Sequence, residues 1–98
     1  MEKVDIQVPS SWKLVQNKAL GEIYIFHKFF PSGEDITVSI NMTDNGYEVR
    51  SIAVSRTTEP SDTIEGITTT LADAAKIAEA QCKWWDEFLS NYWKDKSQ

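Results

Sequence analysis

Residues 71–98 contain neither glycine nor proline, and this uninterrupted stretch predicts one long helix over residues 70–94, followed by a frayed tail at 95–98. A capping box marks its start, because Thr70 can accept hydrogen bonds from the first-turn amides and Asp73 can reach back to it. A helix in a small protein is stabilised mainly by packing of its apolar face. The rest of the chain must therefore supply a layer that covers this helix.

The apolar face of the predicted helix is wider than one small sheet covers. At 100° per residue, a flank made by Ile77, Trp84 and Phe88 widens the apolar arc to about 180°, whereas about 100° is typical of a surface helix. Surplus apolar surface often marks a binding site, so we predict a protein interface at this flank. Coverage by the preceding loop or by an N-terminal strand is the alternative. The central stripe that should pack on the sheet consists of Leu71, Ala74, Ala75, Ala78, Cys82, Trp85, Leu89 and Tyr92.

Residues 1–58 show the period-two alternation of β-strands. The clearest case is residues 36–43, where apolar side chains alternate with hydroxyl and amide side chains. One face of this strand should point to the core and the other to water. Residues 59–69 are polar and include Pro60 and Gly66, so we assign them to a connecting loop. The other predicted strands are residues 4–8, 12–16, 23–30 and 47–57.

Two local features are expected in the last predicted hairpin. Asn45-Gly46 predicts a type I′ turn, because both residue types accept positive φ angles. The apolar residues then change parity between Val49 and Ile52. That change predicts a β-bulge near Arg50-Ser51, or else a strand that is partly covered on both faces.

These segments together predict one α+β domain over residues 1–98. We expect an antiparallel β-meander of four to five strands with one long C-terminal helix packed across one face, in two layers. The chain is acidic, with a formal net charge of −5, and lacks the basic footprint of a typical nucleic-acid binder.

Composition also indicates the compartment. The single cysteine, Cys82, excludes an internal disulfide, and the N-terminus lacks a basic segment followed by an apolar one. No apolar run approaches the roughly 20 residues that cross a bilayer. We therefore expect a cytoplasmic protein that does not enter membranes.

The residues that commonly carry catalysis form no recognisable pattern. His27 and Cys82 are the only residues of their types, so one chain cannot form a conventional zinc site from Cys and His ligands. Cys82 falls on the face expected to be buried, where thiols are usually inert. The acidic pairs Glu34-Asp35 and Asp86-Glu87 are adjacent residues that do not face each other, and we expect them to be solvated charges. We therefore expect no enzyme, no metal and no cofactor.

The leading hypothesis is a small non-enzymatic protein that acts through protein–protein contact. The aromatic flank and the acidic C-terminal part of the chain suit an inhibitor or an adaptor, a type that phages and other mobile elements also encode. A homodimer formed through Ile77, Trp84 and Phe88 is one version of this hypothesis.

The alternative hypothesis is a module that binds single-stranded nucleic acid on its sheet. Aromatic side chains would stack on bases while Lys and Arg contact phosphates. A simpler interpretation than nucleic-acid binding is that every second side chain of residues 23–30 belongs to the core. Both parities of that strand are apolar, which predicts a cover on both sides: nucleic acid, a partner or the N-terminal segment. The residues of this alternative surface are Tyr24, Phe26, Lys28, Arg50 and Arg56.

Overall fold

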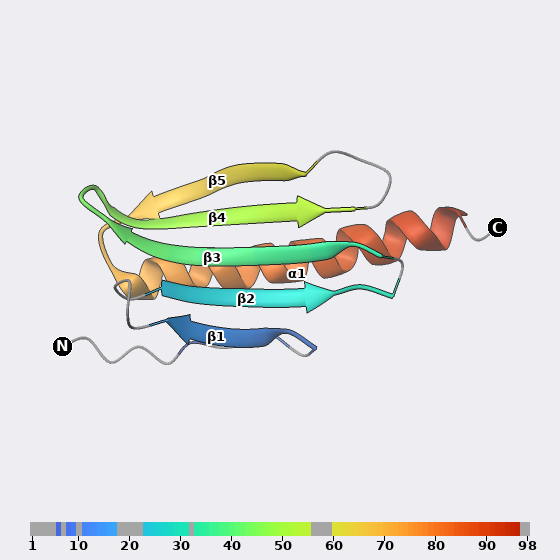
Figure 1. Ribbon diagram of the computed structural model, residues 1–98, viewed down its shortest axis with the longest axis horizontal. Coiled ribbons are helices and arrows are strands. Elements are labelled where there is room, and N and C mark those ends of the chain that lie inside the picture. Colours follow the sequence, from blue (N-terminus) through green and yellow to red (C-terminus); the bar gives the residue numbers. More distant parts are fainter. Residues whose placement is uncertain are drawn as a thin grey trace.

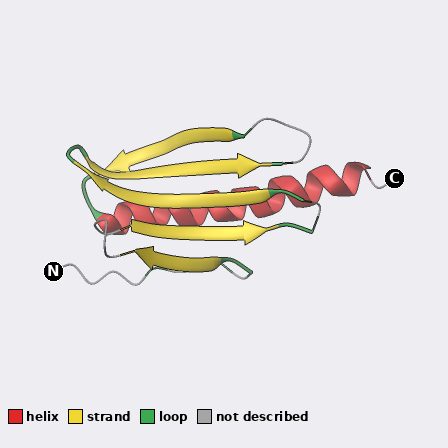
Figure 2. Cartoon of the chain, in the orientation of Figure 1, coloured by secondary structure: helices red, strands yellow, loops and turns green. Residues whose placement is uncertain are grey.

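The chain forms a five-stranded antiparallel sheet with one helix packed on one face, which confirms the predicted α+β architecture (Figures 1 and 2). The computed structural model describes residues 6, 8–9, 11–17, 23–31, 33–55 and 60–96. The strand order is β1-β2-β3-β4-β5, so β1 and β5 are the two edges. The elements are β1 (Lys13–Asn17), β2 (Ile23–Phe29), β3 (Asp35–Thr43), β4 (Gly46–Val54), β5 (Ser61–Thr68) and α1 (Leu71–Lys96).

The loop predicted at residues 59–69 is wrong, because β5 occupies most of it and pairs with β4. An edge strand needs few buried residues, so its hydroxyl-rich sequence resembles a loop. Gly66 also favoured the loop assignment, because glycine is common in loops. In the structure its role is packing. A Cβ placed on Gly66 would lie 3.0 Å from Ile77 Cδ1, so the glycine lets the helix approach the sheet closely.

The N-terminal strand predicted at residues 4–8 is not a strand where the structure describes it. Ile6 and Val8 lie outside any strand, and the rest of that prediction falls outside the described residues. Ile6 nevertheless packs against the core. The fifth strand of the sheet is therefore β5.

The turn between β3 and β4 is tight, but it is not the predicted type I′ turn. Thr43 pairs with Gly46, so Asp44 and Asn45 are the two turn residues. Neither has a positive φ, whereas Gly46 has a φ of 126°. A Cβ on Gly46 would also lie 2.3 Å from the Thr68 carbonyl oxygen. Glycine is required here by the neighbouring strand as well as by the turn.

The predicted bulge is present, but the extra residue belongs to β5. Val49 pairs with Gly66 and Arg50 with Ile64, so Glu65 is left over opposite the step between them. The parity of β4 does not change. Ser51 is buried on the same face of the sheet as Val49. A hydroxyl side chain therefore occupies a position where strand alternation predicts an apolar residue.

The core lies between α1 and the inward face of the sheet. The small side chains of Ala74 and Ala78 are fully buried, as the predicted stripe requires, although the side chain of Tyr92 lies outside the described part. The predicted cap is present, since the Asp73 backbone N–H donates to Thr70 Oγ1 at 3.2 Å. The buried core residues are Trp12, Phe26, Phe30, Ile36, Val38, Ile40, Val49, Leu71, Ala74, Ala78, Cys82 and Leu89.

Asp86 joins the helix to β2 and to the segment before β1, so it is not the solvated charge expected from the sequence. Lys28 Nζ donates to Asp86 Oδ1 at 2.6 Å, and Trp12 Nε1 donates to Asp86 Oδ2 at 3.0 Å. The Lys28 ammonium also lies 4.6 Å from the centre of the Phe30 ring. These contacts orient the second half of α1 relative to the sheet.

We expect Cys82 to be unreactive in the folded protein. Burial, with smaller contributions from the carboxylates of Asp86 and Glu79, raises the pKa of its thiol to about 12 from an ordinary value of 9.0. Because the folded pKa is the higher one, this group's contribution to stability is complete below pH 9 and is lost as the pH rises toward 12. Reaction with a thiol reagent at pH 8 should be slow in buffer and fast in denaturant. Equal rates in the two conditions would contradict the burial.

Candidate functional site

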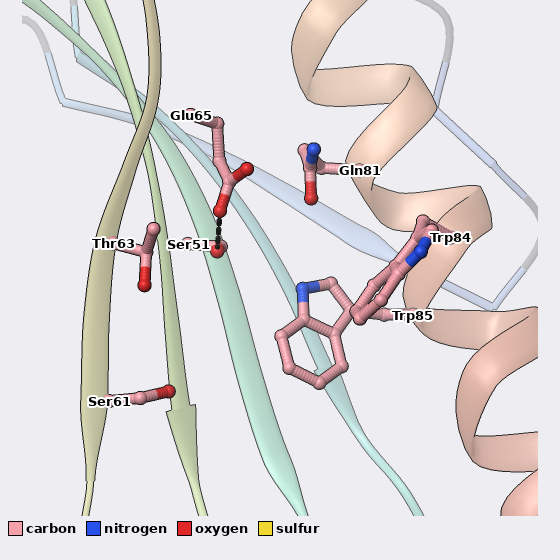
Figure 3. A pocket seen from close by; sticks show the side chains of 7 residues that line it. All are labelled: Ser51, Ser61, Thr63, Glu65, Gln81, Trp84 and Trp85. Carbon is pink, nitrogen blue, oxygen red and sulfur yellow. Dashed lines mark hydrogen bonds between the residues drawn. The ribbon is translucent and has the colours of Figure 1, made fainter.

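A pocket of about 390 Å³ opens between the helix and the last two strands (Figure 3). Its volume lies near the lower end of the range for small-ligand sites, about 300–1,000 Å³. The sheet contributes Ser51 from β4, with Ser61, Thr63 and Glu65 from β5. The helix contributes Gln81, Trp84 and Trp85. Short hydroxyl side chains on the sheet face large indoles on the helix, and this difference in size leaves the space between them.

The bulge in β5 places a carboxylate in this pocket. Glu65 is the unpaired residue of the bulge, and Ser51 Oγ donates a hydrogen bond of 2.8 Å to Glu65 Oε1 (Figure 3). Ser51 itself is buried. Among the described residues, no Lys, Arg or His lies within 4 Å of the Glu65 carboxylate. The pocket therefore has one negative charge without a counter-charge in the described part of the protein.

Trp84, Trp85 and Phe88 form an aromatic cluster beside the pocket. Trp84 stacks on Phe88 with ring centres 4.9 Å apart and planes 7° apart, and Trp85 stands perpendicular to both rings. Trp84 is 49% exposed and Phe88 is 45% exposed. Side chains that are already stacked on a helix lose little conformational freedom when a ligand binds them.

Trp85 brings an unsatisfied donor to the pocket. Its Nε1 atom is buried and has no hydrogen-bond partner among the described residues. Figure 3 shows the indole projecting from α1 toward the sheet, with its nitrogen turned to the pocket. A buried donor without an acceptor costs about 1–3 kcal/mol. This nitrogen is closed to solvent, so an acceptor reaches it only when side chains around the pocket move.

The structure divides the predicted flank of Ile77, Trp84 and Phe88. Ile77 packs against the core beneath Gly66, so β5 covers it. For Ile77 this is the alternative expectation, in which the segment before the helix covers the flank. Trp84 and Phe88 remain about half exposed. The sequence pattern could not identify Glu65, Ser51 or Gln81 as their neighbours, because cross-strand register and helix placement bring these residues together.

The residues proposed for nucleic-acid binding do not share one surface. Phe26 is fully buried, and Lys28 is paired with Asp86 on the helix side of the sheet. Arg50 lies on the opposite face, where it pairs with Glu48 and Asp62. Successive side chains of a strand point to opposite faces of the sheet. The residues proposed for nucleic-acid binding therefore lie on two different faces. Tyr24 has the same parity as Phe26, and Arg56 lies outside the described residues.

The face of the sheet away from α1 has no cover from the segments that the structure describes (Figure 1). Phe29 is 61% exposed there, although the apolar pattern of β2 predicts a cover on both sides. On the same face, His27 Nε2 lies 2.5 Å from Asp35 Oδ1.

Neither a metal-binding cluster nor a membrane-spanning helix is found among the residues that the structure describes. No three His, Cys, Asp or Glu residues there are grouped in a way that could hold a metal ion. No helix in the same part of the chain combines the length and the hydropathy needed to cross a bilayer. Comparison of the chain with protein-family models, with curated proteins and with solved structures gives no match.

Proposed function

We propose that this chain is a non-enzymatic cytoplasmic protein that binds another protein, as an inhibitor or an adaptor does. The observation that carries the proposal is the stacked pair Trp84 and Phe88, which is about half exposed on α1. Tryptophan is among the residues that most often dominate the energy of an interface. Its large ring buries much apolar area on binding at little cost in side-chain entropy.

The position of the aromatic pair supports the proposal further. It lies beside a pocket with several hydrogen-bonding groups, and this combination is typical of specific recognition. The neighbouring strand β5 is an edge of the sheet, so one row of its backbone groups has no partner strand among the described residues. Edge strands of this kind bind extended peptides by adding a strand to the sheet.

Selection from a random-sequence peptide library tests the proposal without a known partner. We expect the wild-type protein to enrich peptides that bind about 30-fold more weakly to Trp84→Ala, because loss of a dominant aromatic contact costs about 2 kcal/mol. The matched control is Phe29→Ala, which removes an exposed aromatic ring from the opposite face. Peptides that bind wild type and Trp84→Ala equally would refute the proposed surface.

Self-association through the same surface is measured separately. Size-exclusion chromatography with light scattering on wild type and Trp84→Asp reports whether the aromatic pair joins two copies. A dimer that Trp84→Asp converts to a monomer would identify a second copy as the partner. A wild-type monomer would leave a different protein as the partner.

A further inference from the structure

We propose that the pocket beside α1 receives an arginine side chain from an extended segment of the partner protein. This inference rests on the proposed function and deepens it, because it names the chemistry of the partner. Three observations carry it: the charge of the pocket, the hydrogen-bonding groups that line it, and its place beside an edge strand.

The charge of the pocket favours a cation. The Glu65 carboxylate accepts one hydrogen bond from Ser51 and has no cationic neighbour in the described part of the chain. Tryptophan rings attract cations through their negative faces, and Trp84 and Trp85 stand at 86° to each other beside this carboxylate. The chain as a whole has a net charge of −5, which also attracts a basic segment from solution.

The lining suits a guanidinium better than an ammonium. Guanidinium is planar, stacks on aromatic rings and presents five N–H donors. Acceptors to match these donors come from the remaining lone pairs of Glu65, the hydroxyl oxygens of Ser61 and Thr63, and the amide oxygen of Gln81. An ammonium has only three donors and cannot stack as a plane.

The edge of the sheet provides a route for such a side chain. Ser61 and Thr63 point toward the pocket from β5 (Figure 3). Within the part of the chain that the structure describes, the other side of β5 has no partner strand. A peptide strand added along β5 would direct alternate side chains to the helix side of the sheet. One of these side chains would lie next to Trp84.

The test uses two short peptides that differ by one group. The first is acetyl-Thr-Thr-Arg-Thr-Thr-amide, and the second has citrulline, which is neutral and similar in shape, in place of arginine. Titration is followed by two-dimensional NMR of the full chain at low ionic strength. We expect the arginine peptide to shift the Trp84 and Trp85 indole signals and the Glu65 amide signal. It should bind about tenfold more tightly than the citrulline peptide.

Variants assign the effect to the pocket. In Glu65→Gln, the arginine peptide should bind as weakly as the citrulline peptide. The matched control, Asp44→Asn, makes the same change of charge in the exposed β3–β4 turn and should keep the tenfold preference. A second variant, Thr63→Arg, places a guanidinium of the protein's own beside Glu65 and should weaken arginine-peptide binding. Far-UV circular dichroism checks that each variant is folded.

The inference is overturned if the two peptides bind equally, if Glu65→Gln keeps the preference, or if neither peptide shifts the indole signals. The peptide library separates this failure from failure of the proposed function. Trp84-dependent peptides without arginine would refute the arginine pocket while supporting protein binding. A library without Trp84-dependent peptides would refute the proposed binding surface.

Discussion

Replacing Phe26 with alanine should lower the free energy of unfolding by about 3–5 kcal/mol, the largest loss that we expect from one substitution in this chain. Phe26 is fully buried in the second strand, where it faces the helix. Removing its ring deletes buried apolar area and leaves a cavity among residues that cannot fully collapse into it. Small domains are stable by only about 5–15 kcal/mol, so this loss is a large share of the total. Urea unfolding followed by tryptophan fluorescence measures it.

Phe29→Ala is the matched control, because it removes the same ring from the same strand. Phe29 faces away from the helix and is 61% exposed, so we expect a loss of less than about 1 kcal/mol. A comparable loss for the two variants would mean that the outward face of the sheet is also covered in solution. That result would favour a partner or a second copy on that face.

Replacing Asp86 with alanine should cost about 2–3 kcal/mol, the second-largest effect. The substitution removes the partner of Lys28, whose side chain is only 19% exposed, and the acceptor of the Trp12 indole N–H. Exposed ion pairs contribute about 0–1 kcal/mol, whereas breaking a buried pair costs about 3–5 kcal/mol. This partly buried pair falls between those values. The change is measured as a shift in the urea midpoint at constant m-value.

Glu87→Ala tests whether position, rather than charge, causes the effect. Glu87 is the next residue on the helix and is exposed, so its removal should change stability by no more than about 0.5 kcal/mol. The double variant Asp86→Leu with Lys28→Met should recover much of the loss, because it leaves no buried charge without a partner. A double variant as unstable as Asp86→Ala would show that the ion pair is not the source of the stability.

The predicted and observed elements differ most at β5. Its hydroxyl side chains, together with Pro60 and Gly66, match the composition of a loop. An edge strand pairs on one side only and exposes much of its surface, so it needs little of the apolar alternation that identifies a central strand. The alternation of residues 36–43, by contrast, predicted a strand because β3 lies in the middle of the sheet and buries Ile36, Val38 and Ile40 on one face.

The candidate site was predictable in part. The exposed flank containing Trp84 and Phe88 followed from counting residues around a helix, which needs no knowledge of the sheet. Glu65 did not follow, because its position in the pocket depends on a bulge whose extra residue lies in an unrecognised strand. Arg50 and Phe26 were predicted to share one nucleic-acid surface, but they lie on opposite faces of the sheet. Strand alternation and pairing, rather than residue type, decide which side chains share a face.

The sequence by itself determined the helix, its buried stripe of small residues and the class of fold. These properties depend on neighbours within a few residues, where periodicity and capping act directly. Only the tertiary structure decided that β5 covers Ile77, that Asp86 joins the helix to the second strand, and that Glu65 faces two indoles. Each of these contacts joins residues distant in sequence or in different elements, so its geometry depends on strand register and helix placement, which no local pattern encodes.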